Sequence, residues 1–153
     1  MYHSQSKYSR WGAVFSSNES PMLLLDAACS RFTQYTNMIE DEDLPKTYAS
    51  CDVFCIAGIA ELQSIVTMEA MATGKPIIAV NALALPHLVQ DGFNGYTYEP
   101  GDIKTLAARL IELLSDQRKR EIMGQKSLEI IAQHDIHKTL AAYEKLYQDA
   151  IGR

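Results

Sequence analysis

Residues 53–80, VFCIAGIAELQSIVTMEAMATGKPIIAV, contain the pattern that decides the fold. The stretch begins with the apolar run Val53–Ile56 and ends with Pro76–Val80, and both runs have the composition of strands buried on both faces. Between them, Ser64–Thr73 is rich in Met and Ala, and the glycine and proline that follow it are typical of a helix end. The stretch therefore predicts a strand, the loop Ala57–Leu62, a helix and a second strand.

The same alternation continues on both sides of this unit. A short helix is predicted before it, over 42–50, with Pro45 in the first turn. After it we predict a short helix over 85–90, a strand over 95–98, and three helices that begin after Asp102, Asp116 and Asp135. One face of the last helix carries the apolar residues Ile136, Leu140, Tyr143, Leu146 and Tyr147. Strands alternating with helices predict an α/β fold, a Rossmann-like parallel sheet with helices on both faces.

The length of the chain is that of one globular domain. It has 153 residues, of which 47% are hydrophobic and 22% charged, enough for a core without metals or disulfides. Residues 1–40 show no sustained helical or strand period, and we expect an irregular leader or a remnant of the first strand–helix units there. The apolar run Met22–Leu25 within them fits either a short strand or the start of a helix. Residues 41–153 are predicted to form the folded domain.

Composition excludes several classes of function. The 14 basic and 19 acidic residues give a net charge of −5, which argues against nucleic acid as a partner. The cysteines at 29, 51 and 55 are odd in number and lack the paired spacing of a zinc or redox site, so we expect a reduced, cytoplasmic protein. No apolar run approaches the ~18 residues of a membrane span, and the start is polar, unlike a signal peptide. Peripheral attachment at the inner membrane face stays compatible with this pattern.

Two carboxylates and a helix start lie together in the central stretch. Glu61 falls in the loop after the first strand, and Glu69 lies eight residues later, about 80° beyond two full helical turns. Between them, the backbone amides from Leu62 to Ile65 form a helix N-terminus, which attracts anions. A carboxylate deeper on that face can accept both hydroxyls of a ribose. Spacing alone leaves two interpretations open: a nucleotide diphosphate site, or two surface acids on an amphipathic helix.

The motif E-x7-E-A-M-A-x-G-x-P, from Glu61 to Pro76, resembles the signature of family 4 retaining glycosyltransferases, the glycosyl transferases group 1. Residues 43–54 before it and 91–102 after it resemble the flanking segments of that family, so the resemblance covers about residues 40–150. It implies that residues 41–153 are the donor-binding, C-terminal half of a GT-B fold. It also implies that the chain is truncated on its N-terminal side and lacks the acceptor-binding domain.

The resemblance implies a function for each part of the central stretch. The expected reaction transfers a hexose from a UDP- or GDP-linked sugar to a lipid or glycan acceptor, with retention of configuration and no cofactor or metal. Glu61 would be the catalytic residue near the donor sugar, and Glu69 would hold the ribose. The amides of Leu62, Gln63, Ser64 and Ile65 would approach the sugar hydroxyls and the phosphates.

The chain also departs from the family pattern. Ala57–Ala60 replaces the usual Pro-Ser, Leu62–Ser64 replaces a glycine-rich segment, and His87 stands where Glu is common. The Gln63-Ser64 pair resembles a subgroup with lipid acceptors. The basic pair that binds the diphosphate has no counterpart in a matching context before Asp43. Two functions therefore stay open: the donor half of an enzyme, incomplete and inactive alone, or a non-catalytic nucleotide-binding or interaction module, which includes a gene remnant that keeps the fold.

Other candidate residues are predicted to be structural. We expect His134 and His137 to flank a capped helix start rather than to bind a metal, and Cys51 and Cys55 to pack as small hydrophobes. The basic run 118–120 is predicted to be a solvated helix face or, failing that, a contact with anionic lipid or with another domain.

Overall fold

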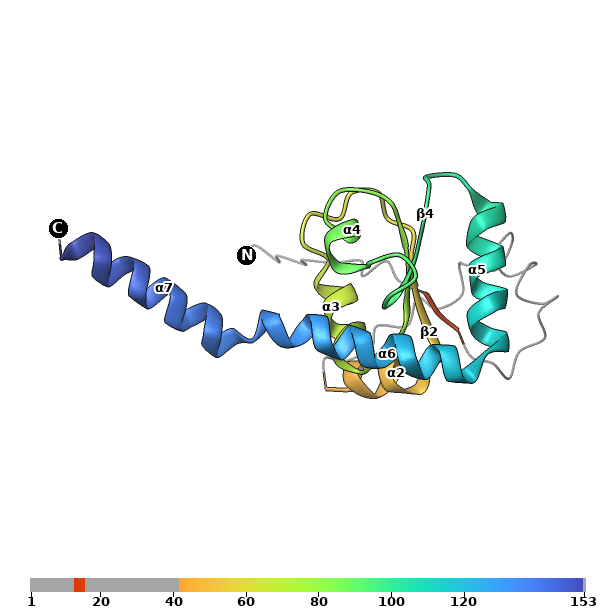
Figure 1. The fold of residues 1–153 in the computed structure, drawn as a ribbon, viewed down its shortest axis with the longest axis horizontal. Helices are drawn as coiled ribbons and strands as arrows, with labels where there is room; N and C mark the ends of the chain where they lie inside the picture. The colour runs from red at the N-terminus through yellow and green to blue at the C-terminus, as the bar shows by residue number, and fades with distance from the viewer. Residues whose placement is uncertain (1–12, 16–41, 153) are drawn as a thin grey trace, which may run out of the picture.

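The computed structural model describes residues 13–15 and 42–152, which contain one sheet (Figure 1). The strands lie in the order β1 (Ala13–Phe15), β2 (Val53–Ile56), β3 (Ile77–Val80) and β4 (Gly95–Tyr98). β2, β3 and β4 are parallel, with Cys55 opposite Ile78 and Ile78 opposite Tyr96. β1 is antiparallel to β2. The three strands predicted from the sequence therefore form the predicted parallel sheet.

Helices cover both faces of this sheet, as predicted. They are α2 (Leu44–Ser50), α3 (Ile65–Ala72), α4 (Leu85–Leu88), α5 (Ile103–Ser115), α6 (Gln117–Ile131), the 3-10 turn η1 (Ala132–His134) and α7 (Ile136–Ile151). α3 and α4 pack on one face, α5 packs on the other, and α6 contacts both α3 and α5 (Figure 1). The α/β class and the Rossmann-like layering are confirmed.

The core lies between the sheet and these helices. All residues of β2 and β3 are buried, which explains their uninterrupted apolar sequence. Met71 of α3 and Leu113 of α5, on opposite faces of the sheet, are fully buried. The three predicted N-caps are confirmed, because the side chains of Asp102, Asp116 and Asp135 each accept hydrogen bonds from backbone amides of the following helix.

α6 packs against the end of α3 through a backbone contact between two glycines. Gly74 follows α3 with φ +71, a conformation that glycine adopts without strain. A Cβ placed on Gly124 of α6 would lie 2.1 Å from the Gly74 carbonyl oxygen, so the two backbones touch. One turn later the buried Ser127 hydroxyl donates to the Lys75 carbonyl at 2.7 Å. The end of α3 is thereby fixed to α6.

Two features differ from the sequence predictions. β1, at Ala13–Phe15, is a strand that the sequence analysis did not locate, because three residues are too few to show a strand period and β1 is defined by its pairing with β2. The run Met22–Leu25 lies outside the described residues. Within the basic run 118–120, Lys119 donates to Glu112 and Arg120 donates to the carbonyls of Leu113 and Leu114. The prediction of a purely solvated face is therefore wrong for these two side chains.

α7 projects away from the rest of the described structure (Figure 1). All of its residues are exposed, and its apolar stripe, predicted to mark one face, has no cover among the residues that the structure describes. Among residues 13–15 and 42–152, no helix is both long enough and apolar enough to cross a membrane.

Candidate functional site

The predicted site lies at the carboxyl ends of β2 and β3, where two loops meet. The loop after β2 contains Glu61, and the loop after β3 runs from 81 to 84. The amide of Ala84 donates to the Glu61 carbonyl at 3.2 Å and joins the two loops. Leu83, next to this link, is a non-glycine residue in the left-handed region, with φ +47. Strain of this kind occurs where the surroundings dictate the backbone, and it is common at functional sites.

Glu61 folds back over its own loop. Its side chain is half-buried, and a Cβ built on Gly58 would lie 3.4 Å from Glu61 Oε1. The neighbouring Leu62 and Gln63 are exposed. The Glu61 carboxylate therefore lies beside Gly58, at the rim of the site.

The N-terminus of α3 presents unused amide donors. Ser64 is its N-cap in a left-handed conformation, φ 49 and ψ 59, and its carbonyl accepts from the amides of Thr67 and Met68. The buried Ser64 hydroxyl pairs with Thr67 Oγ1 at 2.7 Å and so faces inward. The amides of Ile65 and Val66 donate to no group among residues 13–15 and 42–152. No acidic side chain lies in the first turn, so no charge from that turn offsets the positive end of the helix dipole.

Glu69 lies further along α3 and is held by a residue that the sequence analysis did not identify. Its half-buried carboxylate accepts a hydrogen bond at 3.0 Å from the hydroxyl of Tyr48, in α2. Glu61 and Glu69 thus have separate neighbours, Gly58 and Tyr48. No sequence spacing links Tyr48 to Glu69, because they lie 21 residues apart on different helices.

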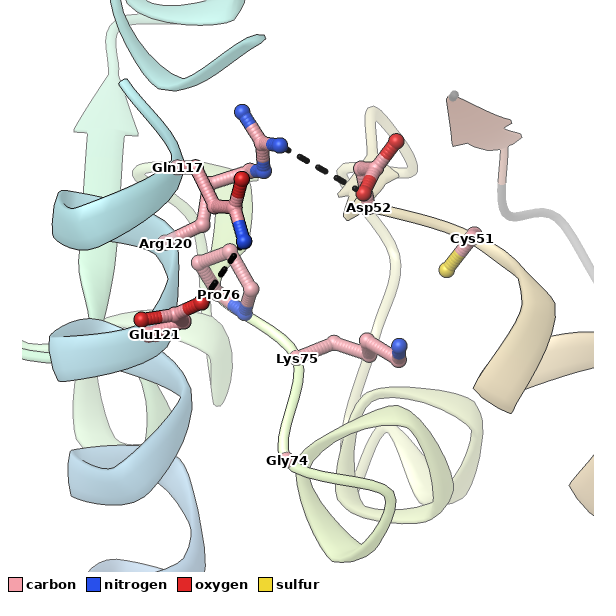
Figure 2. Close-up of a pocket in the computed structure, with 8 residues that line it drawn as sticks. All are labelled: Cys51, Asp52, Gly74, Lys75, Pro76, Gln117, Arg120 and Glu121. Carbon is pink, nitrogen blue, oxygen red and sulfur yellow. Dashed lines mark hydrogen bonds and ion pairs between the residues drawn. The ribbon is translucent and has the colours of Figure 1, made fainter. Parts of the chain in front are cut away.

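A separate pocket of about 300 Å³ lies at the opposite, amino ends of β2 and β3 (Figure 2). Its cations already have structural partners: Arg120 pairs with Asp52 at 3.6 Å, and Lys75 Nζ donates to the Ala49 carbonyl at 2.8 Å. The other lining residues are Cys51, Gly74, Pro76, Gln117 and Glu121. This pocket shares no residue with the site predicted from the sequence.

The cysteines and histidines that were predicted to have structural roles lie in structural positions. Cys51 and Cys55 are buried free thiols, and burial raises the pKa of Cys51 to about 11 and that of Cys55 to about 12. Both thiols therefore stay protonated near neutral pH. His134 ends the turn η1, and His137 donates its backbone amide to Asp135 at the start of α7. Over the described ranges, His, Cys, Asp and Glu side chains form no group of three that could hold a metal ion.

Comparisons with known proteins agree on one family. The model of the family "Glycosyl transferases group 1" matches residues 26–129. The sulfoquinovosyl transferase SQD2 of Arabidopsis thaliana is 33% identical over 104 residues, which are 66% of this chain and 20% of SQD2. The chain spans less than a third of the length of the curated relatives that head the comparison.

Solved structures of similar proteins carry the same fold. Sucrose-phosphate synthase from Thermosynechococcus elongatus gives a TM-score of 0.71 at 25% identity, covering 76% of this chain and 29% of the synthase. Anabaena HepE in complex with UDP-glucose gives 0.57 at 29% identity, covering 65% and 30%. A C-terminal domain of the glycosyl transferase group 1 protein LpcC from Francisella tularensis gives 0.60 at 29% identity, covering 65% and 52%.

The family match covers more than half of the chain and contains the whole loop and helix that carry Glu61 and Glu69. It also contains the three parallel strands around which the site is built. The chain belongs to the glycosyl transferases group 1 family.

Proposed function

We propose that the carboxyl-end site binds a nucleoside diphosphate sugar, and that this chain is the donor-binding part of a retaining glycosyltransferase. The observation that carries the proposal is the combination, on α3, of two N-terminal amides without an acceptor among the described residues and a half-buried carboxylate one turn further on. Anions bind at helix N-termini, and a carboxylate accepts hydrogen bonds from a diol. HepE, a structural neighbour of this chain, has been solved with UDP-glucose, which favours a UDP-linked donor.

The spacing on α3 suits such a donor. Ile65 and Glu69 are four residues apart, or about 6 Å along the helix axis. This rise separates the amides, which would face the diphosphate, from the carboxylate, which would face the ribose. Glu61 would then lie beside the sugar, at the rim formed with Gly58.

The protein's task in this reaction is electrostatic. As the bond from the sugar to the diphosphate breaks, negative charge builds up on the leaving phosphate and positive charge on the sugar. The amides of Ile65 and Val66 would stabilise the phosphate, and the carboxylate of Glu61 would stabilise the sugar. The Arg and Lys that the family resemblance implies for the diphosphate have no identified counterpart here, so we expect weak donor binding.

We propose further that a separate acceptor-binding domain completes the enzyme and delivers a lipid or glycan acceptor. The support is apolar surface that the described residues leave uncovered: Ile59, Leu62 and Ile65 around the site, and the stripe on α7. A non-catalytic nucleotide-binding module is the second candidate, favoured because the basic pair that the resemblance implies for the diphosphate has no identified counterpart in this sequence. Transfer of labelled sugar by this chain alone would exclude that candidate, whereas we expect no turnover. The cytoplasmic location stays a prediction.

Titration calorimetry with UDP tests the proposed site. We expect Glu69→Ala to weaken binding about tenfold, equivalent to about 1.4 kcal/mol. Glu129→Ala is the matched control, because Glu129 is an exposed glutamate of α6 that pairs with Lys126 and should not affect binding. Equal affinity of the Glu69→Ala variant and the native protein, or equal losses in both variants, would refute the assignment.

A further inference from the structure

We propose that Tyr48 is the residue that positions Glu69 for the ribose, so that a side chain of α2 takes part in nucleotide recognition by α3. The inference rests on the proposed function, because it gives a role to a residue behind the same site. It starts from the 3.0 Å hydrogen bond from the Tyr48 hydroxyl to Glu69 Oε2.

Tyr48 is itself held in place. Its side chain is buried, and its ring packs edge-on against Phe54 of β2, with ring centroids 5.7 Å apart and planes at 74°. Phe54 is in turn buried in the sheet. The hydroxyl is therefore presented to Glu69 from a rigid support rather than from a mobile surface side chain.

The two helices are linked a second time, beyond the end of α3. Lys75 Nζ donates to the carbonyl of Ala49, the residue after Tyr48, at 2.8 Å. α2 is thereby tied to the chain on both sides of Gly74, which ends α3. The second link holds α2 beside α3 separately from the hydrogen bond between Tyr48 and Glu69.

The hydrogen bond has the chemistry that a ribose site needs. A carboxylate accepts hydrogen bonds on both of its oxygens, so it can bind a phenol and a diol at the same time. The hydrogen bond also restricts rotation of the carboxylate about its terminal bond, so less freedom is lost when the two ribose hydroxyls bind. Tyr48 would thus act through Glu69 and would not touch the nucleotide.

The test compares two ligands, UDP and 2′,3′-dideoxyuridine 5′-diphosphate, which lacks the ribose diol. Calorimetric titration of Tyr48→Phe, which keeps the ring, should show UDP binding weakened about 3- to 10-fold, the effect of one lost hydrogen bond. Binding of the dideoxy ligand should equal that of the native protein. The double variant Tyr48→Phe/Glu69→Ala should bind UDP no more weakly than Glu69→Ala alone.

Ser50→Ala is the matched control, because it removes another hydroxyl hydrogen bond of α2, from Ser50 to the Thr47 carbonyl, and should leave the affinity for UDP unchanged. Native affinity for UDP in Tyr48→Phe, with a loss in Glu69→Ala, would overturn this proposal and leave the proposed function intact. Equal weakening of both ligands by Tyr48→Phe would show a general structural role and also overturn it. Failure of the native protein to bind UDP would overturn both.

Discussion

The close contact between α3 and α6 predicts that the Gly124→Ala substitution destabilises the protein, whereas the same substitution in an exposed helix is stabilising. Gly124 lies inside α6, where replacing an exposed glycine by alanine stabilises a helix by about 1 kcal/mol. Here the new Cβ would lie 2.1 Å from the Gly74 carbonyl oxygen. A van der Waals contact between these two atoms requires a distance more than 1 Å longer than this. In the Gly124→Ala variant, α6 must therefore move away from α3.

The magnitude follows from what that movement disturbs. Overpacking of this kind costs about 1–3 kcal/mol. The shift also stretches the hydrogen bond from Ser127 to the Lys75 carbonyl, one turn along the same face, which contributes about 1 kcal/mol. After subtracting the gain in helix propensity, we expect Gly124→Ala to lower the free energy of unfolding by about 1–3 kcal/mol.

Urea unfolding followed by far-UV circular dichroism measures this change. Gln125→Ala is the control, because Gln125 is the exposed neighbour on the same helix, and its substitution should change the free energy of unfolding by less than about 0.5 kcal/mol. A Gly124→Ala variant as stable as the native protein, or more stable, would refute the close approach of the two helices.

Three further predictions concern strain, a buried hydroxyl and pH. Leu83→Gly should be about 1 kcal/mol more stable than Leu83→Ala in urea unfolding, because only glycine relieves the positive φ; equal stabilities would contradict the strain. Ser127→Ala should cost about 1–2 kcal/mol by the same measurement, because the hydroxyl is buried, and a cost below about 0.5 kcal/mol would count against its role. Hydrogen bonds from Lys119, Tyr96 and Arg109 lower the pKa of Glu112 from 4.5 to about 2, so ionised Glu112 stabilises the fold above about pH 4.5 and this contribution is lost as the pH falls towards 2. The difference in melting temperature between the native protein and Glu112→Gln should therefore shrink from pH 6 to pH 2.5, and a constant difference would exclude the effect.

The sequence predicted the elements that carry a strong local signal. The apolar runs of β2 and β3 and the aspartates that cap α5, α6 and α7 are features of neighbouring residues, and the structure confirms them. β1 was missed because its three residues depend on pairing with β2. Lys119 and Arg120 were misjudged for the same reason, since their partners, Glu112 and the end of α5, are brought near by the turn between two helices.

Residues of the candidate site also fall into two groups: those that local sequence predicts, and those that depend on how the helices pack. Glu61, Glu69 and the start of α3 follow from motif and helix period, because all lie within one loop–helix unit. Tyr48 could not be found in this way, because its link to Glu69 exists only when α2 packs on α3. The left-handed backbone at Ser64 and Leu83 also has no sequence signal, since neither residue is one that favours such a conformation.

The central claim is that the donor nucleotide binds at the carboxyl ends of the strands, and amide chemical shifts in a titration with UDP test it most directly. Amides from 62 to 66 and that of Ala84 should shift or broaden in proportion to the bound fraction. Amides around Lys75 and Arg120, which line the pocket at the amino ends, should not change. Perturbations confined to that pocket, with none in the loop after β2, would contradict the account.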